Sequence, residues 1–83
     1  MNVTVKYFAS IREAIGQGVE VLQTSAVTLA DLRNELIARG GAHAQALARG
    51  KALRMSQNQV MAVEASTLQE GAEVAFFPPV TGG

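Results

Sequence analysis

Cysteine is missing from the sequence, which has none among its 83 residues. The chain therefore forms no disulfide, holds no metal through thiolates and carries no cysteine nucleophile. Long apolar runs are missing as well: no stretch approaches the roughly 18 apolar residues of a membrane span, and the start of the chain lacks the continuous apolar segment of a signal peptide. We therefore expect a cytoplasmic protein.

Neither sign of charge dominates the composition. Seven basic residues stand against seven acidic ones, and neither sign forms a run that would follow a nucleic-acid backbone or an anionic membrane surface. We therefore expect no nucleic-acid partner and no membrane partner. With 48% hydrophobic residues and no long linker or repeat, the chain predicts one small domain with a modest core.

The first third of the chain predicts two strands. Residues 2–8 alternate between polar and apolar, which is typical of a half-buried strand, and this alternation turns Phe8 outward. Residues 9–18 predict a short helical turn or a loop, and residues 19–23 predict a second strand that pairs with the first as a hairpin. The residues expected on the inner face of the first strand are Val3, Val5 and Tyr7.

The clearest helix begins after Thr28. The Thr28 hydroxyl can cap the first turn and Asp31 occupies the third helical position, while Glu35 and Arg39 are spaced for an ion pair one turn apart. Gly40-Gly41 ends the helix. Its apolar face, which we expect to cover a sheet, consists of Leu29, Leu32, Leu36 and Ile37.

The second half of the chain predicts short elements. Alanine-rich residues 42–50 favour a short second helix, and residues 52–56 and 59–64 predict strands. Residues 73–77 predict a last strand that turns Val74 and Phe76 inward and Phe77 outward.

The order of these elements predicts the fold. Two strands, a helix, two short strands and a closing strand suit an α+β domain with a mixed sheet covered by one main helix. This is the order of the β-grasp, or ubiquitin-like, fold. We expect the domain to span residues 1–77 and an extended tail to span residues 78–83.

The tail has features suited to delivery of its carboxylate. Pro78 and Pro79 fix the backbone and lack an N–H, so they end strand pairing and direct the chain away from the sheet. The tail can reach about 20 Å, at roughly 3.3 Å per residue. Gly82 and Gly83 have no side chain and can thread a narrow channel. The alternative is a frayed, solvated end of the chain.

A carboxylate is a poor electrophile and must be activated before it reacts, most plausibly as an acyl-adenylate made with ATP. The sequence has no phosphate-binding loop, since the glycines at 16 and 18 and at 40 and 41 fit turns and a helix stop. We therefore expect no bound cofactor here and assign the use of ATP to a partner enzyme.

Several segments of the sequence resemble the small subunit of molybdopterin synthase, a family of ubiquitin-like sulfur carriers. The resemblance covers almost the whole chain. It is carried by "VKYFASIREAIG", "TLADLRNELIARG", Asn58-Gln59 and, most specifically, "LQEGAEVAFFPPVTGG" at the end.

The resemblance implies a role in molybdenum cofactor biosynthesis. An E1-like adenylyltransferase would adenylate Gly83, and a sulfur-donating enzyme would supply the sulfur of a thiocarboxylate. That sulfur would pass to cyclic pyranopterin monophosphate in the large subunit, forming the dithiolene of molybdopterin. The catalytic side chains would lie on the large subunit, and the present chain would be a non-catalytic donor. The tail residues that deliver Gly83 would be Gly82, Thr81, Val80, Pro79 and Pro78.

The family works as a heterotetramer, so the chain needs a docking surface. Phe8, Met61 and Phe77 are the outward apolar residues expected near the exposed side of the sheet, and Arg12 is a candidate contact at the rim. If the strand phase is shifted by one residue, the three apolar residues would pack in the core instead. Arg12 fits a solvated surface position equally well.

His43 lies alone in the alanine-rich segment, without ligand neighbours, and is interpreted as a surface residue with no metal role. The acidic residues form no recognisable acid–base pair. Two other functions remain open. A thiamin-type sulfur carrier would share the fold and the diglycine end, and a ubiquitin-like modifier or interaction domain would use Gly83 for attachment or not at all.

Overall fold

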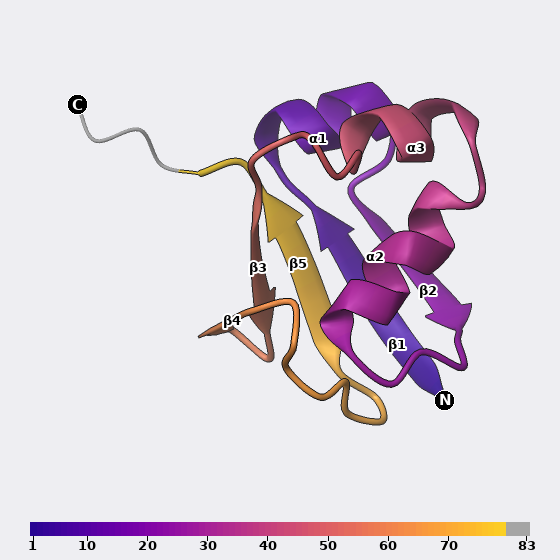
Figure 1. Cartoon of the computed structure of the whole chain (residues 1–83), viewed down its shortest axis with the longest axis vertical. Helices are drawn as coiled ribbons and strands as arrows, with labels where there is room; N and C mark the ends of the chain where they lie inside the picture. The colour runs from indigo at the N-terminus through magenta and orange to yellow at the C-terminus, as the bar shows by residue number, and fades with distance from the viewer. Residues whose placement is uncertain (80–83) are drawn as a thin grey trace.

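A computed structural model describes residues 1–79 of the chain. This part forms a five-stranded sheet and three helices (Figure 1). None of these helices is long and apolar enough to cross a membrane. The elements, in chain order, are β1 (Asn2–Tyr7), α1 (Ala9–Ile15), β2 (Val19–Gln23), α2 (Leu29–Ile37), α3 (Gly41–Ala46), β3 (Arg54–Gln57), β4 (Val60–Ala62) and β5 (Glu73–Phe77).

The strands lie in the order β2, β1, β5, β3, β4. The first and last strands, β1 and β5, are parallel neighbours at the centre, and the remaining pairs are antiparallel. Helix α2 crosses one face of the sheet, while α1 and α3 lie together at the end where β1 and β5 finish (Figure 1). This is the mixed sheet covered by one main helix that the sequence predicts.

The core lies between α2 and the covered face of the sheet. The predicted inner face of β1 is confirmed, because its three residues are at most 1% exposed. Val74 and Phe76 of β5 are also fully buried, as predicted. Each such side chain contributes about 1.5–3 kcal/mol when buried. The three residues of β1 are Val3, Val5 and Tyr7, and the fully buried apolar residues of α2 are Leu29, Leu32 and Leu36.

The start of α2 follows the predicted capping pattern. The Thr28 hydroxyl accepts a hydrogen bond from the Asp31 amide at 3.1 Å, and the Asp31 carboxylate accepts one from the Thr28 amide at 3.1 Å. These bonds satisfy amide groups that have no partner within the helix. They also lower the pKa of Asp31.

The predicted Glu35–Arg39 ion pair was wrong. Helix α2 ends at Ile37, so Arg39 lies beyond its last turn and does not share the helical spacing with Glu35. The Glu35 carboxylate instead accepts a hydrogen bond from the Thr24 hydroxyl at 2.6 Å. Arg39 turns to Glu20 of β2, with 2.6 Å between Nη1 and Oε1.

Arg33 of α2 is buried, with 5% exposure. Its guanidinium donates to the carbonyl oxygens of Leu47 at 2.8 Å, Ala48 at 2.7 Å and Lys51 at 3.3 Å. It also lies 3.7 Å from the Glu64 carboxylate. Burial lowers the pKa of Arg33. This side chain therefore ties the segment between α3 and β3 to the main helix.

Some boundaries differ from the sequence predictions. β1 ends at Tyr7 rather than at residue 8, because Phe8 precedes the first residue of α1. β3 and β4 are shifted and shorter than predicted, because Asn58 and Gln59 form the turn between them. Both have positive φ, at 52° and 68°, as two-residue hairpin turns require.

Candidate functional site

The chain leaves the sheet at the end of β5. Phe77 is its last strand residue, and Pro78 and Pro79 follow it as partly exposed residues outside any strand or helix (Figure 1). Neither proline has an amide hydrogen with which to extend the strand ladder. The predicted reactive end, Val80, Thr81, Gly82 and Gly83, lies outside the described residues.

Phe8 and Phe77 lie at this same end of the sheet. Tyr7 and Phe76 are register partners in the parallel pair β1 and β5, and the Phe8 amide donates to the Phe76 carbonyl at 3.1 Å. Because side chains alternate along a strand, Phe8 and Phe77 point away from the core residues that precede them. Phe8 is 46% exposed and Phe77 is partly exposed.

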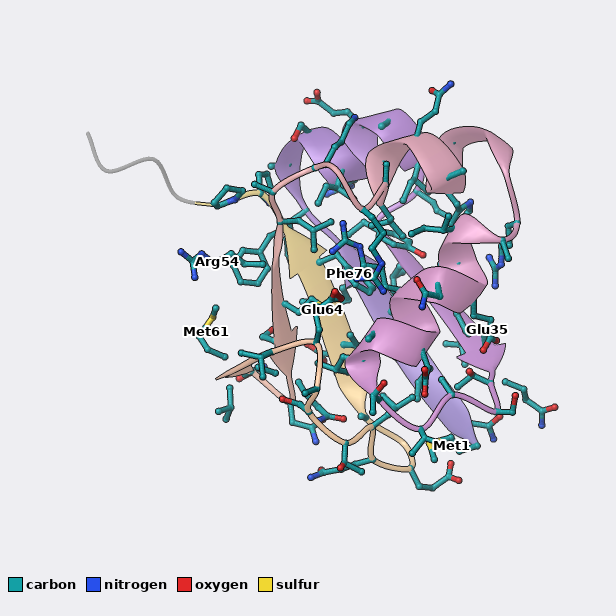
Figure 2. The ribbon with its side chains drawn as sticks, viewed as in Figure 1. Met1, Glu35, Arg54, Met61, Glu64 and Phe76 are labelled. Atoms are coloured by element: carbon teal, nitrogen blue, oxygen red, sulfur yellow. The ribbon has the colours of Figure 1, made fainter. Side chains whose placement is uncertain are left out.

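Two further side chains extend this surface across β3 and β4. Arg54 lies opposite Phe77 in the register of β3 and β5, and Met61 lies one strand further out with 57% exposure. Figure 2 shows Arg54 and Met61 extending in the same direction, away from Phe76 and the core. We call Phe8, Met61 and Phe77 the exit patch. Phe8 and Met61 lie on the surface rather than in the core, and the docking role of all three residues stays a prediction.

Arg54 was not among the predicted site residues. It is exposed, and within residues 1–79 no carboxylate lies at ion-pair distance from it. The other charged side chains nearby on this face, Lys6 and Glu73, pair with each other at 3.5 Å. The alternation that buries Met55 and exposes Arg54 is the signal that would have placed Arg54 beside the patch.

Arg12 lies one helical turn after Phe8, and its amide donates to the Phe8 carbonyl at 3.3 Å. It is exposed on α1 and packs over the connection between β1 and β2, where a side chain at Gly18 would come within 3.1 Å of its Nε. The shallow hollow beside it is lined by Ala9, Glu13 and Gly16 together with Arg12, and includes none of the three patch residues. Its role as a rim contact stays a prediction.

A second group of polar side chains converges on Glu20, and we call it the Glu20 cluster. The Tyr7 hydroxyl donates to Glu20 Oε2 at 2.7 Å, Arg39 Nη1 donates to Oε1 at 2.6 Å, and His43 Nε2 lies 2.9 Å from Oε2. The interpretation of His43 as a surface residue was wrong, since its side chain is only 16% exposed and meets the Tyr7 ring edge-on. Local sequence gave no signal for this cluster, because its members come from four separate segments.

The cluster shifts the acidity of two of its members. Burial alone would raise the pKa of Glu20, but the hydrogen bonds from His43, Tyr7 and Arg39 outweigh it and lower the pKa to about 2. Burial, together with the bond to Glu20, strongly raises the pKa of Tyr7. Glu20 is therefore held as a carboxylate and Tyr7 as a neutral phenol.

The described residues offer no evident metal centre. Within residues 1–79, no group of three or more His, Cys, Asp or Glu side chains is placed to hold a metal ion. At the root of the tail there is a hollow of about 110 Å³ between α1, α3 and Pro78. This volume is well below the roughly 300 Å³ at which ligand pockets begin.

Comparison with known proteins relates this chain to a family over nearly its whole length. The model of the ThiS family matches residues 5–83. A curated relative, the molybdopterin synthase sulfur carrier subunit of Haemophilus influenzae, is 40% identical over 81 residues, which are 98% of this chain and 99% of the relative.

Solved structures share the fold. The SAMP1 protein of Haloferax volcanii, a small archaeal modifier protein, matches with a TM-score of 0.77 and 26% identity over 100% of both chains. A complex of subunits 1 and 2 of the molybdopterin-converting factor of Helicobacter pylori contains a chain that matches with a TM-score of 0.67 and 22% identity, again over 100% of both chains. The predicted β-grasp fold is confirmed by these likenesses.

Proposed function

The chain belongs to the ThiS family, and from this premise we propose that it is the sulfur carrier subunit of a molybdopterin synthase. The observation that carries the proposal is the 40% identity, over 98% of the chain, to a relative of that name. The chain ends in "FFPPVTGG", the segment that most specifically resembles the small subunits of molybdopterin synthase. The β-grasp domain would present the tail, and residues 78–83 would do the chemistry.

The proposed reaction takes place at the carboxylate of Gly83. An E1-like partner would join this carboxylate to AMP at the expense of ATP, releasing pyrophosphate. Sulfide (HS⁻) supplied by a donor enzyme would then attack the acyl carbon, form the C–S bond as the bond to AMP breaks, and leave a thiocarboxylate and free AMP. Pro78 and Pro79 support this scheme, because neither has an amide hydrogen with which to extend strand pairing beyond Phe77.

The second sulfur-transfer partner would be the large subunit of the synthase. The exit patch supports docking there, because Phe8 and Met61 are exposed apolar side chains on the face of the sheet that also carries Phe77, and interfaces are rich in such residues. The related Helicobacter pylori structure is itself a complex of two subunits. Within the large subunit, the thiocarboxylate would pass its sulfur to cyclic pyranopterin monophosphate, and two charged carriers would be consumed for each dithiolene.

Variants at the end of the chain test this function. In a synthase reconstituted from the large subunit, the activating enzyme and a sulfur source, deletion of Gly83 should abolish dithiolene formation. Addition of one residue after Gly83 should do the same, because it moves the carboxylate out of reach without changing the diglycine sequence. Neither change touches the described core, so thermal unfolding should be unaffected. Dithiolene formation by either variant would refute the mechanism.

A ubiquitin-like modifier is the second candidate. The whole-chain likeness to the SAMP1 protein of Haloferax volcanii favours it. Adducts that join Gly83 to lysine residues of other proteins, found by peptide mass spectrometry in the native host, would support this alternative. A thiamin-type sulfur carrier would charge the same carboxylate, and the acceptor distinguishes it: the large subunit with pterin precursor should discharge the present chain, and a thiazole-forming system should not.

A further inference from the structure

The Glu20 cluster joins four parts of the fold through one carboxylate. Tyr7 belongs to β1, Glu20 to β2 and His43 to α3, while Arg39 follows α2. The Glu20 side chain is 14% exposed. A carboxylate so enclosed is stable only when its oxygen atoms are hydrogen-bonded, and both oxygens have partners here. The carboxylate therefore fixes the side chains that donate to it.

Tyr7 connects this cluster to the end of the sheet. Its ring is 1% exposed and stacks on Phe76, with ring centroids 6.2 Å apart and an interplanar angle of 17°. Tyr7 and Phe76 face each other across the two central strands. The residues that follow them in the chain are Phe8 and Phe77, which belong to the exit patch. Glu20 is thus connected to the exit patch, which we propose docks the large subunit, through two contacts. The first joins Glu20 to Tyr7, and the second joins Tyr7 to Phe76.

A second carboxylate, Glu35 of α2, also accepts a short hydrogen bond, but not from Tyr7. Glu35 accepts from the Thr24 hydroxyl at 2.6 Å, and Thr24 pairs through its amide with Met1 at the start of β1. Figure 2 shows Met1 at the bottom of the view and Glu35 at its right side. Glu35 has this one hydrogen bond, whereas Glu20 meets Tyr7, Arg39 and His43, and of the two carboxylates Glu20 alone is bonded to Tyr7.

We propose that Glu20 is a positioning residue for partner docking. Its carboxylate holds the Tyr7 hydroxyl, the Tyr7 ring holds Phe76, and this stack sets the relative placement of Phe8 and Phe77 in the exit patch. The inference rests on the proposed function, because the partner that uses the patch is the large subunit. Within residues 1–79, Glu20 forms no hydrogen bond to a residue of the exit patch, and its effect passes through Tyr7.

The test measures affinity for the large subunit by titration calorimetry. Glu20→Gln keeps the shape of the side chain and removes its charge, while Tyr7→Phe keeps the ring and removes the hydroxyl. Each should weaken binding by about fivefold to tenfold, the size of coupling between residues in contact. The double variant should bind no more weakly than Glu20→Gln, because both changes break one route.

Glu35→Gln is the matched control. It makes the same chemical change at a carboxylate that accepts a short hydrogen bond from Thr24 rather than from Tyr7. Its affinity for the large subunit should stay within about twofold of the wild type, because this change leaves the bond between Tyr7 and Glu20 in place. In NMR spectra, the amide signals of Phe8 and Phe77 should move in Glu20→Gln and stay in place in Glu35→Gln.

Three outcomes would overturn the inference. Unchanged affinity in Glu20→Gln, with unchanged Phe8 and Phe77 signals, would leave Glu20 a structural residue only. Equal losses in Glu20→Gln and Glu35→Gln would show a general effect of stability. Losses that add in the double variant would show that Glu20 does not act through Tyr7.

If the wild-type chain does not bind the large subunit at all, the proposed function fails as well, whereas the other outcomes leave it standing. If Glu20→Gln fails to fold, Tyr7→Phe alone decides by the same readouts.

Discussion

Phe77 lies directly opposite Arg54 across β5 and β3, on the face of the sheet away from the core. The aromatic ring is partly exposed, and the guanidinium beside it has no ion-pair partner within the described residues. Phe77 is also the last strand residue before Pro78. A partner that binds the chain at Pro78 would therefore also cover the Phe77 ring.

Changing Phe77 to aspartate should weaken binding to the large subunit by at least about tenfold, because a charge would replace an apolar side chain of the proposed docking surface. The fold should survive, since Phe77 faces away from the core. Titration calorimetry measures the affinity, and Val21→Asp is the control. Val21 is 74% exposed on β2, at the opposite edge of the sheet. Equal affinities for the wild type and Phe77→Asp would refute the docking assignment.

The low pKa of Glu20 predicts a loss of stability in acid. The folded protein lowers this pKa from 4.5 to about 2, so the stabilisation is complete above pH 4.5 and is lost as the pH falls from there towards 2. The expected size is about 3 kcal/mol, at 1.36 kcal/mol for each pKa unit. Urea unfolding between pH 2 and pH 7 measures it. Glu20→Gln should be less stable than the wild type at pH 7 and should show a flatter acid limb, and an identical slope in both proteins would contradict the assignment.

The raised pKa of Tyr7 predicts a second loss at alkaline pH. The phenol stays neutral in the folded protein because of burial and its bond to Glu20, whereas in the unfolded chain it ionises near its ordinary value of 10.0. Its contribution is therefore complete below pH 10 and declines as the pH rises above 10. The wild type should lose stability between pH 10 and pH 11 more steeply than Tyr7→Phe, as measured by urea unfolding. Parallel curves for the two proteins would show that the phenol is free to ionise in the folded state.

Arg33 should contribute more to stability than an exposed arginine does. Arg33→Ala leaves the carbonyl oxygens of Leu47 and Ala48 without the guanidinium that donates to them, and a buried acceptor left without its donor costs about 1–3 kcal/mol. Arg54→Ala, at an exposed arginine, is the control and should change stability by less than about 0.5 kcal/mol. Urea unfolding at neutral pH compares them. A loss for Arg33→Ala no larger than that of the control would contradict the structural role.

The regular elements could be predicted because their signals are local. The alternation of Val3, Val5 and Tyr7 identifies the buried face of β1, and Thr28 with Asp31 marks the start of α2. The exposure of Phe8 and Met61 follows from the same period of two. The alternation does not predict where a strand ends. β1 stops before Phe8 because α1 begins there, and the positive φ values of Asn58 and Gln59 set the ends of β3 and β4.

The long-range polar contacts could not be predicted. A charged residue on a helix is assigned to the surface by its type, yet Arg33 is buried because three carbonyl oxygens from a distant segment meet it. Glu20 and His43 are separated by 23 residues, and no local pattern shows that they will meet. For the tail, the sequence says more than the structure. Its prolines and glycines predict delivery of the terminal carboxylate, and Val80 to Gly83 lie outside the described residues.

The central claim is that Gly83 carries sulfur, and intact-protein mass spectrometry tests it most directly. The native chain would be purified from its host without thiol-reactive reagents and measured before and after treatment with an alkylating probe. We expect a species in which one terminal oxygen is replaced by sulfur, with the probe attached at Gly83. This species should disappear on addition of the large subunit and pterin precursor. A chain that remains unmodified after incubation with its activating enzyme, ATP and a sulfur donor, or one joined through Gly83 to lysines of other proteins, would contradict it.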